Sequence, residues 1–235
     1  MDCLDIGADN GVISFLLRQR GGNWFSADLS DVAVSSIRNL VQYHVYKIDG
    51  KSTPFQDDQF DKVIIIDFLE HISNDRAFLD ELYRIMKPGA QLVINVPHNK
   101  KGLIPILRFI LRQSDQKHGH LRPGYLFENL GAIMKDKFSI IEHKYYSGFF
   151  SEFMDLLLTS FYGLLGEDTK IAGDNQTSKG TLITSSEMNK YEKLFFIYSL
   201  IYPFVWITSK LDRLLFFLRG YKLIVRAQIN KKNAA

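Results

Sequence analysis

The sequence of 235 residues contains little cysteine, almost no surplus charge and no long apolar run. The single cysteine, Cys3, excludes an intrachain disulfide framework and fits a reducing compartment, so we expect a cytoplasmic protein. Lys and Arg number 29 and Asp and Glu number 26, a formal net charge of +3. That imbalance is too small to indicate a nucleic-acid partner.

The sequence shows neither a signal peptide nor an apolar run long enough to span a membrane. The first residues lack the basic and apolar segments of a signal peptide. The chain instead begins directly on an expected core strand, which leaves open that residues are missing upstream. Its longest apolar run is shorter than the roughly twenty residues that a membrane span needs. Nothing in the sequence indicates an oligomeric state.

Strand and helix patterns alternate through the first half, which predicts a parallel α/β sheet with helices on both faces. The expected strands are Cys3–Ile6, Asn23–Ala27, Val45–Ile48, Lys62–Ile66 and Gln91–Val96. The expected helices between them are Val12–Gln19, Val32–Tyr43 and Arg76–Met86. Lys62–Ile66 is a continuous β-branched run, which is typical of a strand buried on both faces.

The second half is less regular and contains an apolar insertion. Leu126–Met134 is expected to be a helix, and Ser139–Tyr146 and Lys222–Ile229 are expected to be strands. The long connection between those two strands holds two aromatic-rich segments, Phe149–Leu165 and Leu194–Leu218. We therefore divide the chain into a core (1–148), a helical apolar insertion (149–220) and a last core strand with the C-terminal tail (221–235).

A glycine-rich turn, Leu4-Asp5-Ile6-Gly7-Ala8-Asp9-Asn10-Gly11, joins the first strand to the first helix. Glycines there let the backbone approach a ligand, and the helix that follows presents free N–H groups to it. Asp28 ends the next strand, where a carboxylate accepts hydrogen bonds from ribose hydroxyls. Together they indicate a nucleoside-containing cofactor. The alternatives are an ordinary capped helix start and a dinucleotide dehydrogenase, whose fingerprint needs glycines that Asp9 and Val12 replace.

Further segments in the same order resemble the class I S-adenosylmethionine (SAM)-dependent methyltransferases. They are Asp49-Gly50, Phe60-Asp61-Lys62-Val63, Asp67-Phe68-Leu69-Glu70-His71-Ile72 and Arg84-Ile85-Met86-Lys87-Pro88-Gly89. The resemblance implies a Rossmann-like sheet of seven strands whose last strand is antiparallel, with the helical apolar insertion between strands six and seven. It also implies SAM as the cofactor.

The resemblance also implies which twelve residues of this sequence bind the cofactor. They are Asp5, Gly7, Ala8, Asp9, Asn10, Gly11, Asp28, Leu29, Asp49, Gly50, Asp67 and Phe68. Asp9 departs from the family, which has a glycine at that position. Its carboxylate either faces the SAM ammonium, points to water, or repels a bound carboxylate.

Three histidines are the candidate catalytic residues, since an imidazole has a pKa near neutrality and can remove a hydroxyl proton. His71 follows the fourth strand, and His118 and His120 follow the fifth. The alternatives are a structural role for His71 and a solvated basic loop around His118 and His120. We predict no metal site, because no cysteine or further histidine stands at ligand spacing.

The sequence therefore predicts an enzyme that transfers the SAM methyl group to a small or lipid-linked acceptor, more readily to oxygen than to nitrogen or carbon. The insertion would begin at the mouth of the active site, and residues 194–218 would contact a membrane surface, so that the cytoplasmic protein is membrane-associated. A lid over the substrate and a dimer surface are the alternatives for this segment. A non-catalytic relative, in which Asp9 prevents SAM binding and the insertion binds a membrane or partner, is the alternative for the whole chain.

Overall fold

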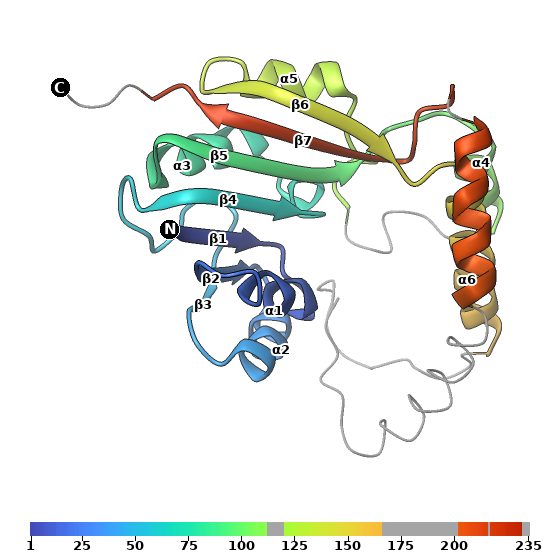
Figure 1. Ribbon diagram of the computed structural model, residues 1–235, viewed down its shortest axis with the longest axis horizontal. Helices are drawn as coiled ribbons and strands as arrows, with labels where there is room; N and C mark the ends of the chain where they lie inside the picture. Colours follow the sequence, from blue (N-terminus) through green and yellow to red (C-terminus); the bar gives the residue numbers. More distant parts are fainter. Residues whose placement is uncertain (112–119, 166–201, 216, 232–235) are drawn as a thin grey trace.

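Seven strands form one sheet in a computed structural model, which describes residues 1–111, 120–165, 202–215 and 217–231 (Figure 1). The strands are β1 (Asp2–Ile6), β2 (Asn23–Asp28), β3 (Val45–Lys47), β4 (Phe60–Ile66), β5 (Met86–Pro97), β6 (Phe138–Tyr146) and β7 (Lys222–Ile229). Their order in the sheet is β3-β2-β1-β4-β5-β7-β6. β7 pairs antiparallel with both β5 and β6, and the other neighbouring pairs are parallel.

The chain reverses its direction across the sheet between β1 and β4. From β1 it proceeds to β2 and β3 on one side, and from β4 it proceeds to β5 on the other. Both central strands are rich in buried apolar side chains, which hold this part of the sheet in the main core. In open α/β sheets, ligands bind outside the carboxyl ends of the strands at such a reversal.

The helices along the sheet are α1 (Val12–Arg18), α2 (Asp31–Val41), α3 (Asp75–Ile85) and α5 (Phe127–Met134), with a short 3-10 turn, η1 (Leu69–His71), after β4. Side chains cap the starts of α2 and α3. The side chains of Ser30 and Asn74 accept hydrogen bonds from backbone N–H groups in the first turns of α2 and α3. Four buried residues at helical spacing on α2, Ala33, Val34, Ile37 and Val41, show which face packs inward.

Three further helical segments lie together beyond the carboxyl ends of the sheet strands (Figure 1). They are α4 (Leu103–Ile110), α6 (Phe149–Leu165) and the helical residues 202–215, whose last turn is η3 (Asp212–Leu215). The guanidinium of Arg108 on α4 bridges to the carboxylates of Glu152 (3.2 Å) and Asp155 (2.6 Å) on α6. This pairing ties a helix of the expected core to a helix of the expected insertion.

The start of α6 is capped by a residue far away in the sequence. The carboxylate of Asp212 accepts hydrogen bonds from the backbone N–H groups of Gly148 (3.0 Å) and Phe150 (2.8 Å) and from the hydroxyl of Ser151 (2.6 Å). Because the first N–H groups of a helix have no partner within it, this contact fixes η3 to the beginning of α6.

The expected sheet is confirmed, with strand seven antiparallel. The expected helices and strands are found with ends shifted by a few residues. β5 differs most, since it begins at Met86 and includes the Lys87-Pro88-Gly89 segment that ends the preceding helix. η1 was not expected. Of the segment 194–218, residues 194–201 and 216 lie outside the described residues.

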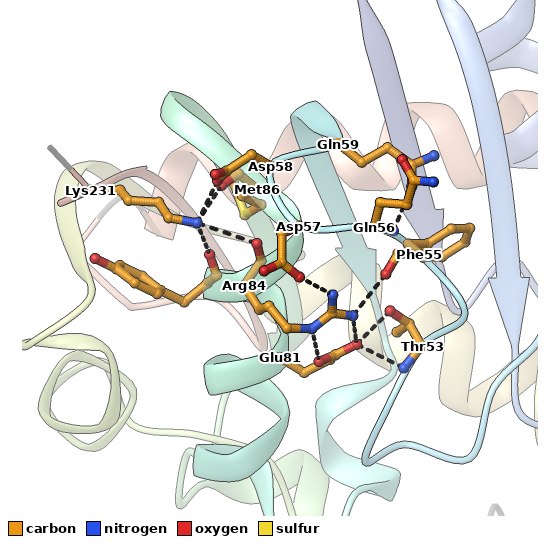
Figure 2. A network of polar contacts seen from close by, with 11 residues as sticks. Thr53, Phe55, Gln56, Asp57, Asp58, Gln59, Glu81, Arg84, Met86 and Lys231 are labelled. Atoms are coloured by element: carbon orange, nitrogen blue, oxygen red, sulfur yellow. Dashed lines mark hydrogen bonds and ion pairs between the residues drawn. The ribbon is translucent and has the colours of Figure 1, made fainter. Parts of the chain in front are cut away.

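A network of polar contacts holds the connection between β3 and β4 against α3, away from the carboxyl ends of the strands (Figure 2). Arg84 donates to both carboxylate oxygens of Glu81 (2.7 and 2.8 Å), to Asp57 and to the carbonyl oxygen of Phe55 (2.9 Å). Glu81 also accepts from the backbone and hydroxyl of Thr53. Burial pushes the pKa of Glu81 upward, but the hydrogen bonds from Arg84 and Thr53 outweigh it and hold the pKa below its ordinary value.

We expect Arg84→Met to lower the free energy of unfolding by about 1–2 kcal/mol, since charge-assisted hydrogen bonds are lost and part of the site is screened by solvent. Urea unfolding at pH 7 measures this. The control is Lys47→Met, which breaks the exposed Lys47–Asp31 pair and should change stability by less than about 0.5 kcal/mol. The contribution of Glu81 is present above its unfolded pKa of about 4.3 and is lost as the pH falls through the lower folded pKa, so the gap between wild type and Arg84→Met should narrow below pH 4. An equal loss of unfolding free energy in Arg84→Met and Lys47→Met would show that the network around Arg84 adds no stability beyond that of an exposed ion pair.

Candidate functional site

The glycine-rich turn between β1 and α1 is shaped by close contacts with its own protein. Gly7 and Gly11 adopt positive φ angles of 80° and 84°. A Cβ on Gly7 would lie 2.5 Å from the carbonyl oxygen of Ile66, and one on Gly11 would lie 2.9 Å from the Cα of Ile37. Packing against β4 and α2 therefore requires both glycines before any ligand is considered. Asp9 also has a positive φ, 49°, a conformation that aspartate tolerates better than most residues.

Asp28, at the end of β2, holds this turn from the neighbouring strand. One of its carboxylate oxygens accepts the backbone N–H of Asp9 (3.0 Å), and the other accepts that of Leu29 (2.7 Å). An ionised carboxylate has about four acceptor sites, so Asp28 keeps capacity for a ligand hydroxyl.

A hollow of about 420 Å³ opens over the turn and the carboxyl ends of β2 and β4. Eight of the twelve predicted cofactor residues line it: Gly7, Ala8, Asp9, Asn10, Asp28, Leu29, Asp67 and Phe68. The predicted catalytic residue His71 lines it as well, together with five residues that the motifs did not indicate: Val12, Ile13, Ser30, Ala33 and Ile66. These five lie next to motif residues in sequence or one helical turn away, so spacing alone could have suggested them.

The other four predicted cofactor residues, Asp5, Gly11, Asp49 and Gly50, do not line the hollow. Asp49 is exposed and accepts hydrogen bonds from the backbone N–H groups of Lys51 and Ser52, both at 2.8 Å. Those bonds hold the pKa of Asp49 below its ordinary value. Gly50 adjoins the site instead, because a Cβ there would lie 3.4 Å from the side chain of Leu29. Roles of these four residues in binding the cofactor stay predictions.

Asp5 lies fully buried beneath α1, where its carboxylate accepts a hydrogen bond from the hydroxyl of Ser14. Ser26 donates to Ser14, and Arg18 donates to Ser26 (2.9 Å), so a polar chain links the carboxylate to a guanidinium. Burial raises the pKa of Asp5 to about 6, although Ser14 and Arg18 act in the opposite direction. This placement favours a role in supporting the turn.

Asp5→Asn should therefore stabilise the protein at pH 7.5 and have little effect at pH 4. Because the folded pKa is raised, wild type loses up to about 3 kcal/mol of stability as the pH rises from about 4 to 6, and the neutral amide does not. Urea unfolding of both proteins at several pH values measures the difference, which would be independent of pH if the carboxylate were ionised throughout. SAM affinity within about threefold of wild type would agree with a supporting role, and a loss of tenfold or more would show direct contact.

A second, larger cavity of about 910 Å³ adjoins the hollow, and Asp67 lines both. Its apolar lining comes from α4 and the segments beside it: Pro97, Ile104, Pro105, Phe109, Leu121 and Pro123. Its polar lining includes Glu70, Asn99, Lys100, Arg108, His120, Arg122, Tyr146, Glu152 and Lys222. Such a mixture fits an acceptor with a large apolar part and a few polar groups.

Asp67 is held at the junction of the two cavities by an ion pair with Lys222, the first residue of β7. The ammonium donates to both carboxylate oxygens, at 2.9 and 2.8 Å. Burial alone would lower the pKa of Lys222, but Asp67 more than offsets it and the pKa is raised. Asn95 donates to Asp67 (3.3 Å) and accepts from the hydroxyl of Tyr146 (2.8 Å). The carboxyl ends of β4, β5 and β6 and the start of β7 are thus joined at the site.

Two of the three candidate catalytic histidines come together beside this junction. The rings of His71, on η1, and His120 lie edge to face with centroids 4.8 Å apart. His71 lines the hollow, whereas His120 lines the larger cavity. His118 lies outside the described residues.

Glu70, which the sequence did not single out, joins these two histidines, and the three offer ligand atoms within 4.8 Å of one another. Ligand spacing along the chain predicts no metal site, but such spacing does not detect groups that the fold assembles from η1 and a segment fifty residues later.

Residues 4–94 match a protein family that is described as a methyltransferase domain. Over these residues, less than half of the chain, the sequence is thus similar to methyltransferase domains. The solved structure of a SAM-dependent methyltransferase from Archaeoglobus fulgidus shares the fold, with 19% identity, 97% of this chain and 85% of that chain covered, and a TM-score of 0.58. SAM is the cofactor of this methyltransferase domain.

Curated relatives resemble the methyltransferase domain over part of their length. A demethylmenaquinone methyltransferase of Tropheryma whipplei (strain Twist) is 28% identical over 115 residues, 47% of this chain and 48% of its own. A ubiquinone biosynthesis O-methyltransferase of Pseudomonas entomophila (strain L48) is 26% identical over 138 residues, 52% of this chain and 59% of its own. The chain thus spans about half the length of the curated relatives it matches.

The residues around the hollow fit SAM chemically. The carboxylate of Asp28 can accept ribose hydroxyls, and the apolar side chains of Leu29 and Phe68 can cover an adenine ring. The carboxylate of Asp9 can provide negative charge for an ammonium, whereas that of Asp67 is already paired with Lys222. Asp67 also lines the larger cavity.

We expect Asp28→Ala to weaken SAM binding at least tenfold, since charge-assisted hydrogen bonds contribute about 1.5–3 kcal/mol each. The effect has a second source, because the substitution also releases the backbone N–H of Asp9. Asp28→Asn separates the two, since its amide oxygen can still accept one hydrogen bond. Calorimetry with SAM and with S-adenosylhomocysteine measures the affinities, and wild-type affinity in Asp28→Ala would show that Asp28 only supports the turn.

Proposed function

We propose that this protein transfers the methyl group of SAM to a small or lipid-linked acceptor, at an oxygen atom. The observation that carries the proposal is the junction at Asp67, where the cofactor hollow meets a larger and partly apolar cavity. A cofactor on one side and an acceptor on the other would then meet at a single point of contact.

SAM supplies a methyl carbon activated by its sulfonium. The protein's own contribution is first to position, with Asp28 holding the ribose and Asp67 standing between the two reactants. Bringing reacting groups into line can supply several kcal/mol of the barrier reduction. The second contribution is to take up the acceptor's hydroxyl proton, and Glu70, His71 and His120 are the polar groups placed beside the junction for this task.

The nature of the acceptor is inferred from the lining of the larger cavity and from the relatives. Apolar residues of α4 and its neighbours line one part of it, while Lys100, Arg108 and Arg122 bring cationic side chains. One relative acts in ubiquinone biosynthesis as an O-methyltransferase, and another is named for demethylmenaquinone. An aromatic acceptor with hydroxyl groups and an apolar part agrees with both observations.

The alternative is a non-catalytic relative, which the unusual Asp9 in the turn favours. SAM titration separates the two. Saturable SAM binding, followed by formation of S-adenosylhomocysteine with hydroxylated aromatic acceptors including demethylmenaquinone, supports the enzyme. No binding at millimolar SAM would overturn it and leave the insertion as the functional part.

We further propose that the helical segments beyond the sheet contact a membrane surface. In the described parts of the chain, no helix has the length and apolarity to cross a bilayer. Exposed apolar side chains nevertheless gather on α4 and on residues 202–215 and 217, among them Phe109 (79% exposed), Phe204 (65%) and Phe217 (67%). Lys210 lies 4.9 Å above the ring of Trp206, so a cation accompanies these residues. Aromatic and basic side chains in one place are typical of an interfacial segment.

The double variant Phe204→Ser/Trp206→Ser should lose binding to anionic vesicles while keeping the stability of wild type, since both side chains are more than half exposed. Co-sedimentation with vesicles measures binding, which should weaken in wild type at high salt because nearby basic residues contribute about 1 kcal/mol each. The control Phe15→Ser/Leu16→Ser removes exposed apolar residues of α1 and should bind like wild type. Wild type that stays in the supernatant would exclude membrane contact.

A further inference from the structure

A carboxylate and two imidazoles meet at the boundary between the cofactor hollow and the acceptor cavity. They belong to Glu70 and His71 of η1 and to His120, and their ligand atoms lie within 4.8 Å of one another. Glu70 is fully buried, and the two histidines are partly buried. Glu70 and His120 line the acceptor cavity, and His71 lines the hollow.

The segment that carries His120 is fastened to η1 at several points. The backbone N–H of Leu121 donates to the carbonyl oxygen of Glu70 (2.9 Å). Arg122 donates to the carbonyl oxygen of Ile72 (2.7 Å) and forms an ion pair with Asp75. The hydroxyl of Tyr125 donates to the carbonyl oxygen of Leu69. These contacts hold His120 next to Glu70 without any ligand, so the group is preorganised.

We propose that Glu70, His71 and His120 bind a divalent transition-metal cation. One carboxylate and two imidazoles suit zinc, iron, cobalt or nickel, whose bonds to histidine nitrogen are about 2.0–2.1 Å long. In a tetrahedral site with such bonds the ligand atoms are about 3.4 Å apart, so modest side-chain rotations from the present arrangement close the site. Three protein ligands leave positions open for oxygen atoms of another molecule.

Because Glu70 and His120 line the larger cavity, a molecule in that cavity would reach the cation, and this gives the cation its role, which rests on the proposed function. An acceptor hydroxyl bound to the cation loses its proton to water more easily, because the cation lowers the pKa of a bound oxygen. That oxygen then forms a bond to the methyl carbon of SAM, and the carbon–sulfur bond breaks with its electron pair remaining on sulfur. The histidines act here as ligands instead of removing the proton themselves. Acceptors with two neighbouring oxygens would occupy both open positions and should be preferred.

Cobalt(II) added to the metal-stripped protein, without a polyhistidine tag and without SAM or acceptor, tests the site. We expect one equivalent to bind with visible absorption bands of nitrogen and oxygen coordination, and zinc(II) to displace it. His120→Ala and Glu70→Gln should each weaken cobalt binding at least tenfold. The matched control is His143→Ala on β6, whose ring stacks on Phe127 and which should bind cobalt like wild type.

Two results would overturn the proposal: no saturable cobalt binding by wild type up to millimolar concentration, or equal affinities of wild type, His120→Ala and Glu70→Gln. Should the buried Glu70→Gln fail to fold, His120→Ala decides alone, because its side chain is only partly buried. SAM calorimetry on the metal-free protein is read separately. Failure of SAM binding counts against the proposed function, whereas failure of cobalt binding with intact SAM binding counts against the metal site only.

Discussion

The ion pair between Asp67 and Lys222 determines how the two halves of this site meet. Asp67 directly follows β4, and Lys222 begins β7, the strand to which the chain returns after the whole insertion. Both side chains are only about one-third exposed, so the pair is less screened than the surface ion pairs of the molecule. With Asn95 and Tyr146 it joins four strands at their common edge. The larger cavity and the hollow adjoin at this contact, since Asp67 lines both.

The hollow on one side of this contact is shaped mainly by the backbone, whereas the larger cavity on the other side is shaped mainly by side chains. The cofactor side is a backbone structure, in which glycine geometry, close packing against Ile66 and Ile37 and the hydrogen bonds of Asp28 fix the turn. The larger cavity is lined by side chains of α4, α6 and the segments beside them, and ion pairs such as Arg108 with Glu152 link these elements. Backbone constraints tolerate few substitutions, whereas side-chain linings can change one residue at a time. A single cofactor chemistry can therefore be combined with many acceptors.

The sequence predicted best what depends on local pattern. β-branched runs identified β4, and motif order placed Gly7, Asp28 and Asp67 around one hollow. It failed where a contact joins distant segments. Neither the pairing of α4 with α6 through Arg108 nor the approach of His120 to Glu70 has any signal in spacing. Asp5 shows a different limit, because a motif gives the position of a residue in the chain but not the direction of its side chain. Its carboxylate turns to Ser14 beneath α1 instead of toward the hollow.

The cap that Asp212 places on α6 joins residues 64 positions apart, and its consequence concerns how such a protein can diverge. The entropic cost of closing a flexible loop grows only with the logarithm of its length, so doubling the intervening chain costs about 0.6 kcal/mol. Insertions and deletions between the two partners are therefore nearly neutral for stability, provided that the aspartate and the helix start are kept. A lineage could lengthen, shorten or replace this stretch in search of new acceptors while the machinery for the methyl donor stays unchanged.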